Sequence, residues 1–176
     1  GPKDDPYHRT PNWRKPYPVR EGEELKVLVN RAKENNVIFY WAIHPGQDIR
    51  WNEEDRSLLL QKFESMYQLG VRGFAVFFDD ISGEGTKADK QAELLNYIDD
   101  HFVKVKRDVA PLILCPTEYN KSWTDVEGGY LTTLGDKLNE GIKVMWTGDM
   151  VVATIDKSTL DFVNPLLKRK AYIWWN

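Results

Sequence analysis

The sequence predicts an α/β fold in which parallel strands alternate with helices. Short apolar runs rich in Val, Ile and aromatic residues recur along the chain, and stretches with apolar residues at helical spacing separate them. Parallel strands need such helical crossovers, so this alternation is typical of a parallel sheet. We expect the strands near residues 37–43, 73–78, 111–115, 142–146 and 171–175.

Two aspartates follow one strongly apolar run. The segment from Gly73 to Phe78 carries no charge, and Asp79 and Asp80 come directly after it. Such a run is typical of a strand buried on both faces, and α/β proteins hold catalytic groups at the carboxyl ends of these strands. Because burial and a like-charged neighbour both raise a carboxyl pKa, the pair suits a general acid beside an ionised helper. Two other interpretations stay open, namely acids in an exposed turn before a helix and ligands of Mg²⁺ or Ca²⁺.

The remaining segments are expected to be loops and helices. Residues 1–20 are rich in proline, which excludes a helix there. Ser158, with Asp161 three residues later, resembles a capping box and predicts the start of a last helix. The other helices are expected over residues 21–35, between Asn52 and Gly70, over 88–104 and near 130–138.

Polar or aromatic side chains follow every predicted strand. Because parallel strands end at one edge of a sheet, these side chains converge as they do at the mouth of a (β/α)8 barrel. Five strands are fewer than the eight of a closed barrel, so we expect residues 1–176 to form one domain, an incomplete TIM barrel that lacks its first and last strands. Open sheet edges would favour self-association. The side chains that follow the strands are His44, Asp48, Asp79, Asp80, Tyr119, Asn120, Thr147, Asp149 and Asn176.

Composition narrows the classes of partner. The net charge is -3 and no basic block occurs, so nucleic acid is not an expected partner. No apolar run is long enough to span a membrane. The three histidines, at positions 8, 44 and 101, show no metal-ligand spacing, so no metal and no cofactor are expected. Seven Trp and eight Tyr suit sugar rings as well as a hydrophobic core.

Five short motifs carry a resemblance to a known family. They are Gly-Pro-Lys-Asp-Asp-Pro-Tyr-His at 1–8, Phe-Phe-Asp-Asp-Ile at 77–81, Pro-Thr-Glu-Tyr-Asn at 116–120, Trp-Thr-Gly at 146–148 and Trp-Trp-Asn at 174–176. These motifs resemble glycoside hydrolase family 84, the O-GlcNAcases and related β-N-acetylglucosaminidases, and most of all its Bacteroides-type bacterial enzymes. The resemblance implies a retaining exo-β-N-acetylglucosaminidase that acts on GlcNAc-bearing glycoconjugates or O-GlcNAc-modified proteins. It also suggests an extracytoplasmic location, periplasmic or secreted, in a bacterium.

The resemblance implies a role for each matching residue. Asp79 would orient the 2-acetamido group of the substrate, whose oxygen attacks the anomeric carbon and forms an oxazoline. Asp80 would protonate the leaving oxygen and then deprotonate water, although Glu118 is a rival for the acid. Tyr119 would hydrogen-bond the acetamido oxygen. The other matches are Lys3 and Asn176 for sugar hydroxyls, Thr147, Val151 and Trp174 for the acetamide pocket, and Cys115 near its floor.

The sequence also departs from the family pattern. The Gly-rich, Trp-containing motif of the family's first strand does not precede Gly1, and the further aspartate and asparagine that grip the sugar do not follow Asn176. An alternative expectation is therefore a truncated or engineered fragment with weak or no activity. Such a fragment would act as a GlcNAc-binding scaffold or need complementation by another segment or chain.

Overall fold

A five-stranded parallel sheet forms the centre of the fold. The computed structural model describes residues 5–173. The strands lie in the sheet in the same order as in the sequence, and every neighbouring pair is parallel. This arrangement confirms the predicted α/β class. The strands are β1 (Tyr40–Ile43), β2 (Gly73–Phe77), β3 (Ile113–Cys115), β4 (Lys143–Trp146) and β5 (Tyr172–Ile173).

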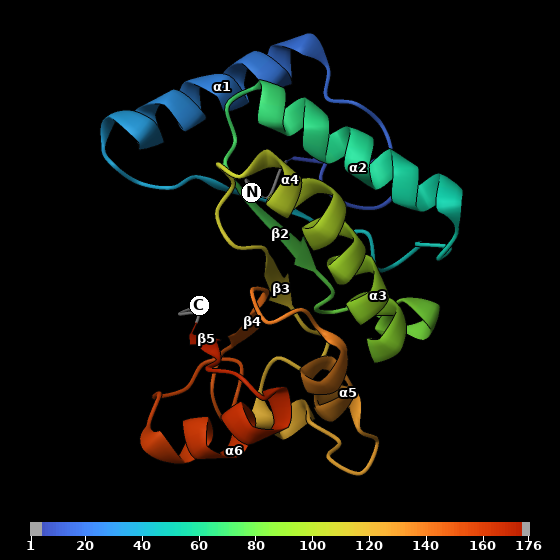
Figure 1. Cartoon of the computed structure of the whole chain (residues 1–176), viewed down its shortest axis with the longest axis vertical. Helices are drawn as coiled ribbons and strands as arrows, with labels where there is room; N and C mark the ends of the chain where they lie inside the picture. Colours follow the sequence, from blue (N-terminus) through green and yellow to red (C-terminus); the bar gives the residue numbers. More distant parts are fainter. Residues whose placement is uncertain (1–4, 174–176) are drawn as a thin grey trace.

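Helices connect the strands and follow one another in an arc around the sheet (Figure 1). Short 3-10 turns, η1 (Gly83–Thr86) and η3 (Lys121–Trp123), lie in the loops after β2 and β3. The helix after η1 passes through a π-helical turn, η2 (Asp99–Val103), near its end. The α-helices are α1 (Val19–Glu34), α2 (Glu53–Gln68), α3 (Ala88–Ile98), α4 (Lys104–Lys106), α5 (Tyr130–Lys137) and α6 (Lys157–Leu167).

The two faces of the sheet pack against different partners. Successive strand residues point to opposite faces, so Phe74 and Val76 of β2 join the large core that the helices cover, together with Phe63 of α2. Ala75, between them, belongs to a smaller cluster made of strand and loop residues alone. The other buried members of this inner-face cluster are Ile113, Cys115, Tyr119 and Met145.

The first strand is shorter than the sequence predicts. Val37 and Ile38 were expected in it, but they are 60% and 61% exposed and β1 begins at Tyr40. The pairing with β2 starts at Tyr40 and Gly73, so residues 37–39 have no partner in that neighbouring strand. Apolar character alone therefore overestimates the length of this strand.

Two helix starts test the capping predictions. Asn52 caps α2 as expected, because its side-chain oxygen accepts a hydrogen bond of 2.9 Å from the backbone N–H of Asp55. The prediction for the last helix is wrong by two residues. Asp156, not Ser158, is the cap of α6, since its carboxylate accepts from the backbone N–H of Thr159. The Ser158 hydroxyl donates to the same carboxylate, and Asp161 accepts from Lys157 instead of closing a capping box.

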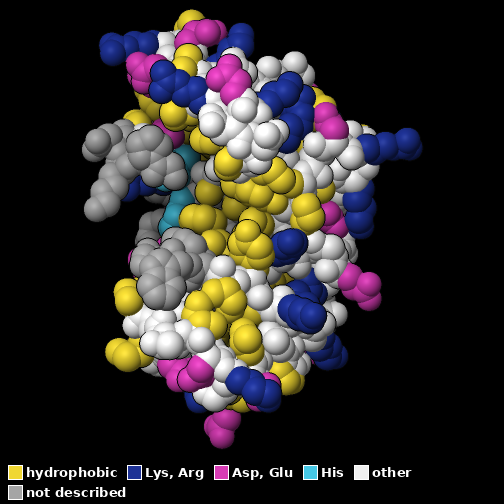
Figure 2. Space-filling view, turned by 90° about the vertical axis from the view of Figure 1, so that its left-hand side faces the viewer, with side chains coloured by type: hydrophobic (Ala, Val, Ile, Leu, Met, Phe, Trp, Pro, Cys, Tyr) yellow, Lys and Arg dark blue, Asp and Glu magenta, His cyan; other side chains and the backbone are white. Residues whose placement is uncertain are grey.

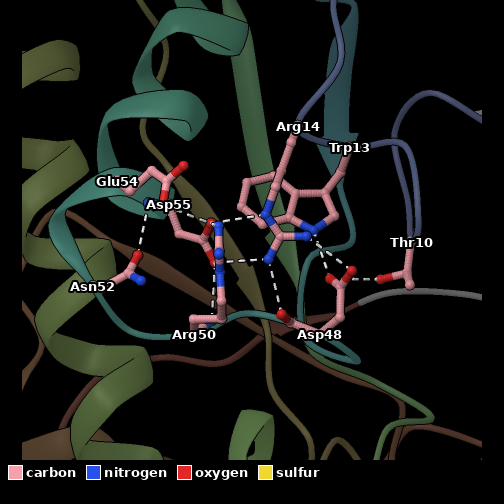
Figure 3. Close-up of polar contacts among 8 residues, drawn as sticks. All are labelled: Thr10, Trp13, Arg14, Asp48, Arg50, Asn52, Glu54 and Asp55. Atoms are coloured by element: carbon pink, nitrogen blue, oxygen red, sulfur yellow. Dashed lines mark hydrogen bonds and ion pairs between the residues drawn. The ribbon is translucent and has the colours of Figure 1, made fainter.

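A polar network fixes the segment before α1 to the loop after β1 (Figure 3). The Arg14 guanidinium donates to both oxygens of Asp55 at 2.7 Å and to Asp48 at 2.9 Å. Trp13 also donates to Asp48, through its ring N–H at 2.7 Å. Burial alone would raise the pKa of Asp55, but hydrogen bonds from Arg14 and Arg50 hold it well below its usual range. The N-terminal segment is thus a packed part of this fold.

Candidate active site

Asp79 extends the inner face of β2 beyond the end of the strand. Ala75 and Phe77 face the inner side, and the alternation of a strand places Asp79 on the same side. Phe78, one residue earlier, is fully buried on the helix side. The Asp79 side chain is 17% exposed, so it is partly buried at the rim of the sheet.

Asp80 leaves the strand direction at this point. Its φ is +51°, in the left-handed region that non-glycine residues seldom adopt, and its side chain is exposed. The Tyr119 hydroxyl, in the loop after β3, donates to the Asp80 carboxylate at 3.4 Å. The two carboxylates are therefore adjacent in sequence but differ in surroundings, and Tyr119 lies beside the more exposed one.

His44 contacts the other aspartate. Its Nε2 lies 3.1 Å from Oδ1 of Asp79, and both side chains are partly buried. His44 directly follows β1, whose last residue Ile43 pairs with Val76. This register places His44 level with Phe77, whose ring it meets edge-on at 6.4 Å. His44 was predicted to lie among the side chains that converge at the strand ends, but its contact with Asp79 was not predicted, because no periodic pattern indicates which strand-end residues touch.

Cys115 lies near Asp79 on β3, the strand that pairs with β2 on the side away from β1. It ends β3, pairs with Phe77 and is fully buried. Burial raises the pKa of the Cys115 thiol well above its ordinary value, and the nearby carboxylates and a hydrogen bond to Asp79 raise it further. The thiol therefore stays protonated and can donate to Asp79.

Tyr119 is a neutral hydrogen-bond donor at this rim. Its side chain is buried and packs edge-on against Trp123 at 4.9 Å. Burial, followed by the negative charges of Asp80 and Asp79, raises the pKa of its phenol. A protonated phenol beside a carboxylate can donate to that carboxylate or to a ligand that lies against it.

Two further predicted residues lie on the next strand end. The buried Thr147 follows β4, and its backbone N–H donates to the Tyr119 carbonyl at 2.9 Å. Its hydroxyl donates to the Met150 carbonyl, also at 2.9 Å. Val151 packs against the inner-face cluster that contains Cys115 and Tyr119. The structure thus brings six predicted site residues to one region: Asp79, Asp80, Cys115, Tyr119, Thr147 and Val151.

The remaining predicted residues are placed elsewhere or lie outside the described part. Lys3, Trp174 and Asn176 lie outside residues 5–173. Glu118, the rival acid, lines a hollow of about 520 Å³ together with Lys87 and Tyr130. Burial raises its pKa, but no contact joins it to the aspartate pair. Glu118 is therefore separate from the aspartate pair.

A buried polar network supports the loops that carry the site, and no sequence pattern predicted it. The Gln91 side chain of α3 donates to Gly85 of η1 at 2.8 Å and to the Thr117 hydroxyl at 2.9 Å. Thr117 in turn donates to the Phe78 carbonyl at 2.8 Å, directly before the aspartates. Tyr130 of α5 donates to Gln91 and accepts from the Thr117 N–H. A lone glutamine within a helix gives no sequence signal for such a role.

Two negative findings concern residues 5–173. In that part of the chain, no group of three or more His, Cys, Asp or Glu side chains is arranged to hold a metal ion. None of its helices is both long and apolar enough to cross a membrane.

Fold and site together define a class of protein. Parallel strands with helical crossovers, and carboxylates at the strand ends, are typical of α/β-barrel enzymes, a class that includes glycoside hydrolases. The sequence model of the β-N-acetylglucosaminidase family matches residues 1–176. The chain belongs to this family, glycoside hydrolase family 84, of the O-GlcNAcase type.

Known relatives agree in sequence and in structure. The protein O-GlcNAcases of Rattus norvegicus and Mus musculus are each 36% identical over 185 residues, which cover 99% of this chain and 20% of theirs. The structure of CpGH84B superposes with a TM-score of 0.92 at 39% identity, over 100% of this chain and 32% of that one. A mutant of the Thermobaculum terrenum O-GlcNAc hydrolase superposes with a TM-score of 0.88 at 30% identity, over 99% of this chain and 39% of that one. The chain thus spans about a fifth of the length of the curated relatives.

Proposed function

We propose that the protein containing this chain is a retaining exo-β-N-acetylglucosaminidase. Its substrates would be GlcNAc-bearing glycoconjugates, including O-GlcNAc-modified proteins, as the names of its relatives suggest. The observation that carries this proposal is the pair Asp79 and Asp80, adjacent in sequence yet held by different partners. Family membership and the geometry of this pair support the same chemistry.

The proposed mechanism uses the substrate's own acetamide. Enzymes with two catalytic carboxylates usually place them on opposite sides of the glycosidic bond, which two residues in direct succession at one strand end are poorly placed to do. In the proposed division of labour, Asp79 accepts a hydrogen bond from the acetamido N–H, and the acetamido oxygen attacks the anomeric carbon to form an oxazoline. Asp80 protonates the leaving oxygen and later removes a proton from the attacking water.

Other side chains would shape the pocket for the acetamide. Tyr119, as a neutral donor, would hydrogen-bond the acetamido oxygen as it becomes nucleophilic. Cys115, Thr147 and Val151 would line the space around the acetamide. This part of the proposal is supported by the packing of Cys115, Tyr119 and Val151 in one inner-face cluster and by the hydrogen bond from the Thr147 N–H to the Tyr119 carbonyl.

The first test uses leaving groups of different acidity. In the intact protein, Asp80→Asn is expected to lower kcat/KM on a fluorogenic β-GlcNAc substrate by about 100-fold or more, because the general acid is lost. A dinitrophenyl leaving group needs no protonation. On a dinitrophenyl substrate, kcat/KM of Asp80→Asn should therefore lie much closer to the wild-type value. Asp79→Asn should stay slow on both substrates. Equal losses for both variants on both substrates would contradict the assigned roles.

The second test addresses the nucleophile. Fluorine atoms on the acetamido methyl group withdraw electrons from the oxygen, so turnover should fall with each added fluorine if that oxygen attacks. A rate that does not depend on fluorination would exclude substrate assistance. GlcNAc binding without any turnover in the intact protein would favour the alternative of a sugar-binding scaffold.

A further inference from the structure

His44 contacts Asp79 directly, at 3.1 Å between Nε2 and Oδ1. We propose that His44 is a positioning residue for Asp79, one that holds this carboxylate in the orientation that grips the substrate's acetamide. The inference rests on the proposed function, since it assigns His44 a task in that reaction. It concerns a residue that directly follows β1, whereas the aspartates lie beyond the end of β2.

The surroundings of His44 hold its ring in place. Its backbone N–H donates to the His8 carbonyl at 2.7 Å, and a parallel bridge joins it to Arg9. These contacts pair His44, one residue beyond the end of β1, with the N-terminal segment. The ring meets Phe77 edge-on, with an interplanar angle of 80°. Backbone and ring are thus fixed from both neighbouring segments, so the Nε2 position is set by the fold.

The contact also fixes the proton on the imidazole. An ionised carboxylate can only accept hydrogen bonds. His44 therefore carries a hydrogen on Nε2 and donates a hydrogen bond to Asp79. Once Oδ1 is engaged, Oδ2 of Asp79 remains available for the acetamido N–H. A carboxylate held in this way is already oriented when the substrate binds. This preorganisation lowers the barrier for the attack of the acetamido oxygen that Asp79 orients.

Cys115, which ends β3, also lies near Asp79, but its thiol donates to the Pro116 carbonyl at 4.0 Å. A thiol is a weaker donor than an imidazole N–H. We therefore expect that His44 contributes most of the orientation of Asp79 and that Cys115 contributes less.

A double-mutant cycle in the intact protein tests the proposal. His44→Leu should lower kcat/KM on an activated aryl β-GlcNAc substrate by about 10- to 100-fold, the size of loss that a displaced catalytic group causes. His44→Gln keeps an N–H donor and should stay within about fivefold of wild type. In the Asp79→Asn background, His44→Leu should cost less than about threefold, because a residue that acts through Asp79 has nothing left to position.

The controls separate this role from a structural one. His101→Leu changes an exposed histidine at η2 and should leave turnover unchanged. In the Asp80→Asn background, His44→Leu should retain its full cost. An equal cost of His44→Leu with and without Asp79, or a loss in His44→Gln as large as in His44→Leu, would overturn the proposal. Wild-type protein without β-GlcNAc turnover would instead overturn the proposed function, and this inference with it.

Discussion

Asp80 has a left-handed backbone, and this conformation separates its role from that of Asp79. A non-glycine residue in this region costs about 1 kcal/mol, although aspartate tolerates it better than most. The strain is kept at the residue that we propose as the acid, at the rim where the chain turns away from the strand. Strained conformations of this kind concentrate at functional sites.

Tyr119 provides a test at the same scale. Tyr119→Phe removes the hydroxyl that donates to Asp80 but keeps the ring that packs on Trp123. We expect kcat/KM to fall by about 100-fold, comparable with the loss of one donor to a developing charge. The free energy of unfolding should change by about 1 kcal/mol or less. Kinetics and urea unfolding of the same sample check both, and a variant with activity within threefold of wild type would contradict the role.

Single residues of the site were predictable from sequence to different degrees. Asp79 and Asp80 follow an uncharged strand, so their place at the rim could be read from the chain. The contact between His44 and Asp79 could not, because it depends on the register of β1 against β2. Register is a property of the folded sheet, and a parallel sheet gives no turn that would fix it locally.

The loops after β2, β3 and β4 behave as one joined element. The Thr147 N–H donates to the Tyr119 carbonyl, and the Lys121 N–H donates to the Gly148 carbonyl at 3.0 Å. On the other side, η1 packs so closely on the loop after β1 that a Cβ at Gly85 would overlap the carbonyl oxygen of Gly46. Only glycine fits this contact. The joined loops hold the aspartates and Tyr119 in fixed relative positions.

Gln91 is the residue whose removal should loosen these loops. Gln91→Leu leaves the Gly85 carbonyl without its donor and the Tyr130 hydroxyl without its acceptor, in a fully buried place. We expect a loss of about 3 kcal/mol in the free energy of unfolding, since each buried unpaired group costs 1–3 kcal/mol. Urea unfolding measures it. Gln61→Leu, at an exposed position of α2, serves as the matched control.

A second variant makes this prediction sharper. Adding Tyr130→Phe to Gln91→Leu removes the hydroxyl that has lost its acceptor, at the cost of the hydrogen bond from the Thr117 N–H. Because the hydrogen bond between Tyr130 and Gln91 can be lost only once, the double variant should be less unstable than the sum of the two single variants. Strictly additive losses would show that the two side chains do not act as one network.

Element boundaries were harder to predict than element types. All five strands lie where apolar runs predicted them, yet β1 and β3 begin later than expected, at Tyr40 and Ile113. A strand begins where a neighbour pairs with it, and the apolar run carries no information about the neighbour. The start of α6 was wrong for a related reason, because Asp156 and Ser158 are both good caps and only the folded backbone decides between them.

At the scale of the whole molecule, two features matter: the hydrophobic surface and the polar contacts that hold the N-terminal segment. Figure 2 shows a face on which hydrophobic side chains gather in a central band, with charged side chains at its upper and lower ends. Large apolar side chains such as Val37 and Ile38 are exposed. The expected self-association stays a prediction.

Polar contacts hold the residues before α1 against the rest of the fold. They involve Arg14, Asp55 and the buried amine of Lys62.

Lys62 makes the stability of the fold depend on pH. Its Nζ donates to the carbonyls of Tyr7 and Lys15 and lies 4.5 Å from the Tyr17 ring centre, so α2 holds the N-terminal segment through this amine. Burial lowers the pKa of Lys62 from 10.5 to about 8, and the nearby Asp5 carboxylate raises it only in part. Between these two pKa values the unfolded chain binds more protons than the folded chain, so stability must rise with pH.

We expect this contribution to add about 2 kcal/mol to the free energy of unfolding between pH 7.5 and 9.5. The range ends below the ordinary pKa of tyrosine, because burial raises the pKa of Tyr17 and its ionisation in the unfolded chain would oppose the effect. The buried Cys115 thiol, whose pKa is also raised, opposes it within this range but does so equally in wild type and in the Lys62 variant. Urea unfolding of wild type, Lys62→Met and the exposed-site control Lys33→Met gives the comparison. Lys62→Met should be less stable at every pH, since two carbonyls lose their donor, and between pH 7.5 and 9.5 its free energy of unfolding should gain about 2 kcal/mol less than that of the other two proteins. The same pH dependence in all three proteins would remove Lys62 as a cause.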